Sequence, residues 1–204
     1  EKGRDYLRRM SGAAERMQGL IDDVLVYSRV TTRRNPPQTT DLNELVDDAV
    51  GDLQMRLEST GGKVHAADLP QLEVDPTQMR QLFMNLISNS LKFHRPGVPP
   101  VITITAEKSA GNGHGSAETS KRAWTLAVSD NGIGFDEKYA AKVFEPFRRL
   151  HARSEYEGTG MGLAICRKIA NRHGGDISAA SVPGKGTCFT ITLPAPRAAG
   201  RGPG

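Results

Sequence analysis

Cysteine is scarce in this sequence of 204 residues. Its two cysteines, Cys166 and Cys188, form no CxxC pair and lie among apolar neighbours. This pattern favours two buried thiols over a disulfide. We therefore expect two buried thiols in a reducing compartment and a cytoplasmic location.

Aromatic residues and charge of one sign are also few. Trp, Tyr and Phe number 1, 4 and 6, and 27 Lys and Arg against 23 Asp and Glu leave a formal charge of only +4. A nucleic-acid surface normally combines a clustered basic face with stacking aromatics. The one basic cluster is too short to follow a nucleic-acid backbone; it comprises Arg148, Arg149, His151 and Arg153. We expect no nucleic-acid partner.

Long hydrophobic runs are missing. No segment approaches the ~18 uncharged apolar residues that span a bilayer, and no charged-then-apolar leader opens the sequence. Hydrophobic residues make up 37%, and 22 glycines bring the apolar share to that of globular proteins. We expect a soluble polypeptide with a sizeable core. Because it opens without Met, within a helical pattern, we expect a fragment whose intact form could carry a membrane tether upstream.

Residues 1 to 33 carry an uninterrupted helical pattern. One row of positions recurs at the three-four spacing of a heptad seam: Leu7, Met10, Ala14, Met17, Ile21, Val24 and Ser28. A second row widens the stripe: Tyr6, Ala13, Leu20 and Tyr27. Such a stripe is typical of a bundle helix with more than one neighbour. The helix therefore dimerises or needs a partner helix that this sequence lacks, and Pro36 and Pro37 end it.

A compact domain is expected from residue 38 to 194. Asp41 to Glu44 form a capping box that opens a helix to about Ser59, and Asp75 caps a second helix that runs to Phe93 or His94. A third helix is expected from Gly160 to His173. Strand composition occurs at 39–40, 63–67, 72–74, 101–105, 124–128, 177–181 and 187–193. Residues 109–120 predict a mobile hairpin loop, and residues 195–204 a disordered tail.

The helix that begins after Asp75 has an unusual polar stripe. Asn85, Asn89 and Lys92 fall at i, i+4 and i+7, on one face. A solvated face is the ordinary interpretation, but Asn has poor helix propensity, so two asparagines one turn apart weaken it. An amide oxygen can ligate Mg²⁺, and a lysine one turn further on can meet phosphate oxygens.

Two glycine-containing segments could contribute to the same binding site as that stripe. Asp130-Asn131-Gly132-Ile133-Gly134-Phe135 follows a strand, where a carboxylate can accept from an exocyclic amine, although Asp-Asn-Gly is also an ordinary turn. Gly158, Gly160 and Gly162 open a helix, and the N–H groups there suit a pyrophosphate. A Rossmann fingerprint fails because position 163 is Leu, and the order around Lys185 breaks a Walker loop.

In this order and spacing the segments resemble the ATP-binding domain of sensor histidine kinases, a branch of the fold shared with gyrase, Hsp90 and MutL. Five segments carry the likeness over roughly 41–194, namely an N box at 85–93, glycine boxes at 130–135, 158–162 and 184–187, and an F box at 144–147. The resemblance implies an α+β fold, an α/β sandwich with helices on one face of a mixed sheet. It also implies a flexible lid between Phe135 and Gly158.

The resemblance further implies a role for each matching residue. Asn89 would ligate Mg²⁺ with Asn85 nearby, Lys92 and Arg149 would meet the phosphates of ATP, and Asp130 would hold the adenine amine with Thr187 behind it. Asn85, Lys92 and Arg149 would serve catalysis. The remaining positions implied to bind nucleotide are Phe93, Gly132, Ile133, Gly134, Phe144, Gly158, Thr159, Gly160, Met161, Gly162 and Leu163.

Residues 1–34 are similar to the second helix of the dimerisation hairpin in such kinases, whose first helix carries the phosphoacceptor histidine. None of the five histidines here lies in that helix or precedes an acidic residue: His65, His94, His114, His151 and His173. Only His151, in the implied lid, is expected near nucleotide. The resemblance thus implies a histidine kinase that phosphorylates a histidine outside this chain, for relay to a response regulator, and an intact homodimer.

Three other interpretations stay open. A hydrolysing ATPase of the gyrase or MutL kind shares the fold, but its site equivalent to Asn85 resembles a Glu that activates water, and Asn cannot take a proton at neutral pH. A non-catalytic dimerisation module would use its glycines only as turns. A serine kinase of the anti-sigma type is disfavoured by the bundle helix, and phosphoamino-acid analysis would distinguish it.

Overall fold

The computed structural model describes residues 2–32, 35–109, 123–150, 156 and 158–195. Apart from Ser109 and Ala195, the expected hairpin loop over 109–120 and the expected tail over 195–204 lie outside these residues, as do His151 and Arg153 of the basic cluster. Among the described helices, none has both the length and the apolar character of a transmembrane span.

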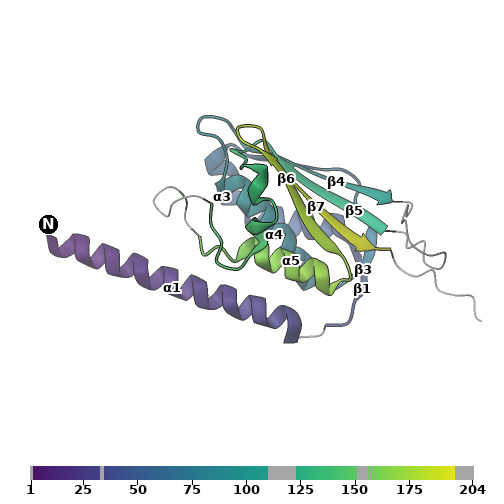
Figure 1. Cartoon of the computed structure of the whole chain (residues 1–204), viewed down its shortest axis with the longest axis horizontal. Helices are drawn as coiled ribbons and strands as arrows, with labels where there is room; N and C mark the ends of the chain where they lie inside the picture. The colour runs from purple at the N-terminus through teal and green to yellow at the C-terminus, as the bar shows by residue number, and fades with distance from the viewer. Residues whose placement is uncertain (1, 33–34, 110–122, 151–155, 157, 196–204) are drawn as a thin grey trace, which may run out of the picture.

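A five-stranded mixed sheet forms the centre of the domain (Figure 1). Its strand order is β2-β4-β5-β7-β6, with β2 parallel to β4 and the other pairs antiparallel. The strand bounds are Lys63–Ala66 for β2, Val101–Ser109 for β4, Ala123–Asp130 for β5, Asp176–Val182 for β6 and Gly186–Pro194 for β7. A separate antiparallel pair joins β1 (Gln38–Asp41) to β3 (Gln71–Val74).

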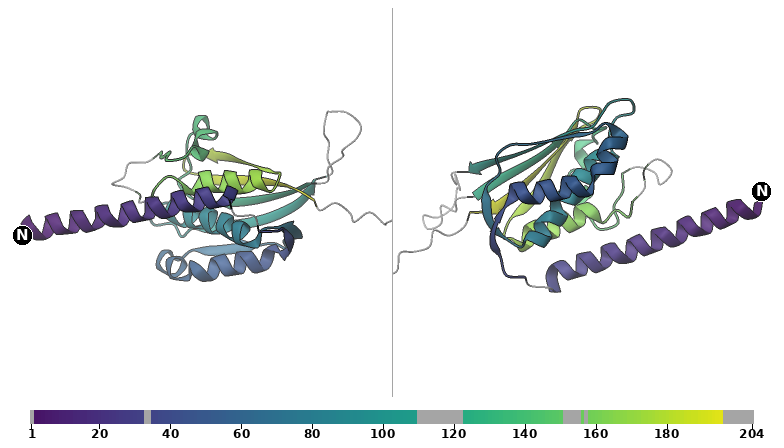
Figure 2. Two further views of the ribbon diagram at one scale, coloured as in Figure 1. Left: turned by 90° about the horizontal axis from the view of Figure 1, so that it is seen from below. Right: turned by 180° about the vertical axis from the view of Figure 1, so that it is seen from behind.

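The helices of the domain gather on one face of this sheet (Figure 2), so the expected sandwich is confirmed. They are α2 (Leu42–Asp52), α3 (Gln54–Thr60), α4 (Pro76–Lys92) and α5 (Gly162–Arg172). The core lies between the two layers. Its largest fully buried side chains include Met79, Leu82, Phe83, Leu86 and Ile87 of α4 and Ile102, Ile104 and Leu126 of the sheet. The apolar face of α4 is therefore fixed, and its polar stripe must face elsewhere.

Both predicted helix starts are confirmed. The Asp41 carboxylate accepts from the Asn43 N–H, and the Asp75 carboxylate accepts from the N–H groups of Thr77 and Gln78. The expected single helix from 42 to 59 is wrong, because it breaks at Leu53. There the Leu53 N–H bonds the Val50 carbonyl, and this tighter turn redirects the chain so that Leu53 itself is buried.

The N-terminal helix α1 (Lys2–Thr32) extends past the rest of the molecule in Figure 1, while its C-terminal part lies along α5. Val30 is buried there, and the Lys168 ammonium lies 3.7 Å from the Tyr27 ring centroid. In the second predicted row, Ala13, Leu20 and Tyr27 are half-buried. The first row is open, with exposed fractions of 67% at Leu7, 68% at Met10, 59% at Met17 and 54% at Ile21.

Candidate functional site

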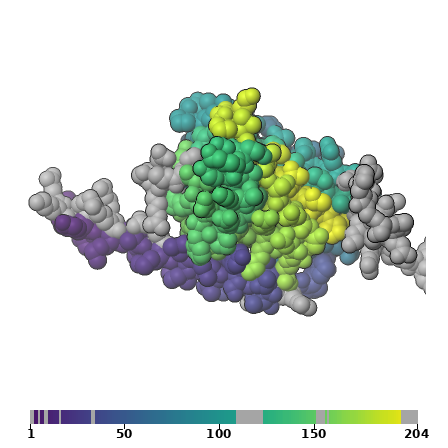
Figure 3. All heavy atoms as spheres, viewed as in Figure 1, coloured from purple at the N-terminus to yellow at the C-terminus, as the bar shows by residue number. Residues whose placement is uncertain are grey.

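A cavity of about 410 Å³ lies between α4, the start of α5 and the ends of β5 and β7, within the ~300–1,000 Å³ of typical ligand pockets. Most of the predicted site residues line it: Asn85, Asn89, Lys92, Phe93, Asp130, Ile133, Gly134, Arg149, Gly158, Thr159, Gly160, Gly162, Leu163 and Thr187. In the space-filling view (Figure 3), the segment with the short helices η1 (Glu137–Tyr139) and η2 (Lys142–Phe144) stands above α1.

Asp130, the last residue of β5, supplies a carboxylate inside this cavity. Its Oδ1 accepts from the N–H of Gly132 at 2.8 Å and from the N–H of Thr187 at 3.2 Å, and its Oδ2 lies 3.1 Å from Ser90 Oγ. Burial raises the pKa of Asp130 above its usual value, and these hydrogen bonds oppose that rise. Each carboxylate oxygen has two acceptor sites, so Oδ2 retains one for a further donor.

Glycines let the chain pass close to this carboxylate. A Cβ at Gly132 would lie 2.8 Å from Asp130 Oδ1. Gly186 has φ of +105°, and a Cβ there would lie 3.0 Å from Asn131 Cα. Side chains at these two positions would displace the strand ends that hold Asp130 in place.

The polar stripe of α4 forms one wall of the cavity, and its two asparagines differ in their hydrogen bonds. Asn85 Nδ2 donates to the Gly162 carbonyl at 3.2 Å, and its Oδ1 accepts from Gln81 at 3.1 Å. This ties α4 to the first residue of α5. Asn89 has no side-chain hydrogen bond within the described part of the chain, so its amide oxygen is available to a ligand.

Lys92 reaches over the second glycine segment. A Cβ at Gly158 would lie 2.7 Å from Lys92 Nζ, which shows how closely the ammonium approaches that loop. Nζ also lies 4.3 Å from the centroid of the Phe93 ring, and that ring packs on Tyr156 at 4.9 Å. An ammonium held against an aromatic ring and beside a glycine loop suits an anionic ligand.

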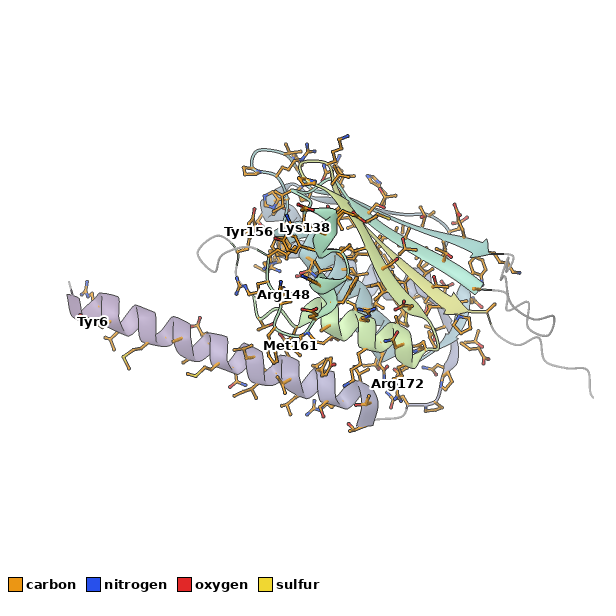
Figure 4. The ribbon with its side chains drawn as sticks, in the orientation of Figure 1. Tyr6, Lys138, Arg148, Tyr156, Met161 and Arg172 are labelled. Carbon is orange, nitrogen blue, oxygen red and sulfur yellow. The ribbon has the colours of Figure 1, made fainter. Side chains whose placement is uncertain are left out.

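Arg149 is anchored to the same loop. Its guanidinium donates to the carbonyls of Tyr156 and Gly158, both at 2.5 Å. Arg148 beside it lines the cavity, and Figure 4 shows Arg148 and Tyr156 on the same side of the body above α1. Arg149 thus organises the loop in this structure, and a contact with phosphate remains a prediction.

Three predicted residues do not line the cavity. Gly132 acts through its N–H to Asp130, whereas Phe144 and Met161 are buried. Phe144 packs edge-on against Phe189 at 6.3 Å. Other cavity residues escaped the sequence reasoning, among them Asp23, Arg56, Ser88, Arg148 and Tyr156. Of these, Ser88 and Arg148 had local signals, because Ser88 falls within the N box one turn after Asn85 and Arg148 belongs to the basic cluster beside Arg149.

The side chains of the cavity suit a metal ion only if a bound small molecule supplies further ligand atoms to that ion. No group of three or more His, Cys, Asp or Glu side chains that could hold a metal occurs among the residues that the structure describes. Mg²⁺ usually keeps several waters and is bound through one or two protein oxygens plus substrate phosphates. The available Asn89 amide fits that mode, so these residues suit Mg²⁺ brought with a nucleotide.

The chain is similar to known proteins along nearly its whole length. Residues 74–197 match the family described as "Histidine kinase-, DNA gyrase B-, and HSP90-like ATPase". The chain is 38% identical over 194 residues to phytochrome-like protein Cph1 of Synechocystis sp., covering 95% of this chain and 24% of that protein. It is 42% identical over 178 residues to cyanobacterial phytochrome A of Nostoc sp., covering 87% and 22%. The chain spans about a quarter of the length of these relatives.

Two solved structures show the same architecture. Full-length ShkA in complex with AMPPNP superposes with a TM-score of 0.72 at 23% identity, over 97% of this chain and 40% of that one. The catalytic domain of histidine kinase ThkA gives a TM-score of 0.60 at 25% identity, over 78% of this chain and 97% of that domain. The first likeness includes α1, since it extends over nearly the whole chain.

Proposed function

This chain belongs to the family of histidine kinase-, DNA gyrase B- and HSP90-like ATPases, and on that premise we propose that it is the catalytic part of a two-component sensor histidine kinase. It binds Mg²⁺ and ATP and transfers the γ-phosphoryl group to a histidine outside this chain. From there the phosphoryl group passes to an aspartate of a response regulator. The match to relatives of much greater length supports a multidomain parent protein.

One observation carries the proposal. A single cavity joins a buried carboxylate, Asp130, to an available carboxamide, Asn89, and an ammonium, Lys92. The free acceptor site on Asp130 Oδ2 suits the exocyclic amine of adenine. The ammonium and the loop N–H groups suit the phosphate tail, so the two ends of ATP find complementary partners.

Asn89 would hold Mg²⁺ brought with the nucleotide, and the ion would supply charge neutralisation at the phosphates. Lys92 binds phosphate oxygens over the Gly158 loop, and the Asn85–Gly162 hydrogen bond fixes the start of α5 beside them. Phosphoryl transfer needs mainly position and charge neutralisation, which these groups supply. Asn85 cannot act as a base toward water, so we expect negligible steady-state hydrolysis.

The described part of α1 carries no histidine, so the acceptor comes from a partner helix. The exposed row from Leu7 to Ile21 gives that helix an apolar surface. Homodimerisation of the intact protein through this row and a cytoplasmic location complete the proposal. Light scattering of the intact protein tests the dimer, since a monomer at all concentrations would remove it.

Calorimetric titration with ATP and Mg²⁺ tests the nucleotide site. We expect saturable binding by the wild-type chain, a loss of at least about 10-fold in affinity for Lys92→Ala, and no phosphate release. Lys108→Ala, which removes a lysine at the far end of β4, is the matched control and should bind normally. Unchanged affinity in Lys92→Ala would favour the non-catalytic module, and rapid phosphate release would favour a hydrolysing ATPase.

A further inference from the structure

We propose that Arg56, contributed by α3, is an additional phosphate-binding residue of this nucleotide site, an inference that rests on the proposed function. Arg56 lies outside all five motifs, yet it lines the same cavity as Asn85, Asn89 and Lys92. It adds a cation that comes from α3, an element that carries none of the motifs. The ligand chemistry is that of a nucleoside polyphosphate.

A hydrogen bond between two helices holds Arg56 at the cavity. One terminal guanidinium nitrogen donates to Ser88 Oγ of α4 at 2.8 Å. Ser88 lies three residues after Asn85 and four before Lys92, so it shares their face of the helix. The guanidinium is therefore held beside the polar stripe, although α3 itself contributes no other stripe residue.

The charge of Arg56 has no acidic partner in the described structure. No carboxylate of the described residues lies within ion-pair distance, and among those residues Ser88 is the only hydrogen-bond partner of the guanidinium. Arg80 of α4 is by contrast paired with Asp52 of α2. Guanidinium has five N–H donors in a fork that fits phosphate oxygens, and the bond to Ser88 uses one of them.

The position around α4 assigns Arg56 to the phosphate tail. At about 100° per residue, Ser88 lies roughly 60° to one side of Asn85, and Asn89 about 40° to the other side. Ser90, which contacts the purine-recognising Asp130, lies further round beyond Asn89. Arg56 thus joins the edge of the stripe that is remote from the purine end. It meets the triphosphate and not the base.

ATP titrations of charge variants test this assignment. Arg56→Gln should weaken ATP binding about 5- to 20-fold, Arg56→Lys should weaken it less, and Arg56→Glu should weaken it most. Ser88→Ala, which frees the arginine from its anchor, should fall between wild type and Arg56→Gln. Because Arg56 is exposed, its three variants should keep the wild-type melting temperature within about 2 °C.

Arg80→Gln is the matched control, since it removes an arginine of α4 that lies outside the cavity, and its ATP affinity should equal that of wild type. If Lys92→Ala loses affinity while Arg56→Gln and Arg56→Glu bind within about two-fold of wild type, the role of Arg56 is refuted and the proposed function stands. If the wild-type chain binds no ATP, the proposed function fails, and this inference fails with it.

Discussion

The Asp23 carboxylate of α1 accepts a hydrogen bond from the hydroxyl of Thr159, 136 residues away in the glycine loop. The same hydroxyl oxygen accepts from the N–H of Met161 at 3.2 Å, directly before α5. Asp23 and Thr159 both line the nucleotide cavity. One threonine therefore links the N-terminal helix to the loop that we assign to the phosphates.

Thr159→Val should loosen α1 from the domain, because it keeps the side-chain shape and removes the donor to Asp23. The lost bond is worth about 1 kcal/mol, so amide exchange across residues 19–30 should become several-fold faster. Thr32→Val is the control, since its hydroxyl bonds only Ser28 within α1 in the described structure. Equal exchange in wild type and Thr159→Val would mean that Asp23 and Thr159 do not hold the helix.

Asp130→Asn should lower the affinity for ATP without lowering the free energy of unfolding. The single hydroxyl hydrogen of Ser90 is shared between the Leu86 carbonyl and Asp130 Oδ2, both at 3.1 Å. The amide that this substitution introduces would donate to Ser90 and leave that hydrogen to Leu86, so the free energy of unfolding should stay equal or rise.

The same amide would face the adenine amine with a donor, so ATP affinity should fall at least about 10-fold. Denaturant unfolding and calorimetry measure the two quantities on the same preparations. A variant that binds ATP as tightly as wild type would show that Asp130 does not contact the purine.

Nucleotide affinity should fall on acidification at a higher pH than an ordinary aspartate would produce. Burial raises the pKa of Asp130, and only the ionised carboxylate has both oxygens free to accept. Its contribution is thus complete above the raised pKa and is lost as the pH falls through it. Titrations with ATP from about pH 8 to about pH 5 should show a steeper loss of affinity for the wild-type chain than for Asp130→Asn, because the ligand titrates identically with both proteins and only the wild type has the carboxylate. Parallel loss of affinity in the two proteins would contradict this role of Asp130.

Gly186→Ala should destabilise the domain far more than Gly184→Ala. Both glycines have positive φ, +105° at Gly186 and +77° at Gly184, but a Cβ at Gly184 would meet nothing within 4 Å. At Gly186 the new Cβ would collide with the backbone at Asp130 and Asn131. We expect about 1 kcal/mol for Gly184→Ala and about 3 kcal/mol or more for Gly186→Ala in chemical unfolding. If both substitutions lowered the free energy of unfolding equally, the positive φ would explain the loss and the predicted collision at Gly186 would not.

Local signals were enough to predict most of the fold. Asp75 and Pro76 define where α4 begins, and its apolar and polar faces follow from spacing alone, so the stripe from Asn85 to Lys92 was predictable. The break at Leu53 was not, because Gly51 two residues earlier is only a weak signal inside a helical pattern, and burial of the leucine decides where the helix ends. Propensity yields to tertiary packing at such positions.

The site residues that the sequence did not predict are held by contacts between distant segments. The hydrogen bond from Asp75 N–H to His173 Nε2 joins residues 98 apart, and the one between Arg56 and Ser88 joins residues 32 apart. No periodic pattern in the sequence connects the two members of either pair. Motifs supplied Asp130, Asn89 and Lys92, whereas Asp23 and Arg56 became visible only when the helices were packed.

Transfer of radiolabelled γ-phosphate tests the central claim most directly. The chain would be mixed with labelled ATP, Mg²⁺ and a separately supplied helical hairpin that bears an acceptor histidine. We predict acid-labile, base-stable label on the histidine of the acceptor, absent with Asp130→Asn or Lys92→Ala and retained with Arg80→Gln. Label on serine, or free phosphate with none on the acceptor, would contradict the account.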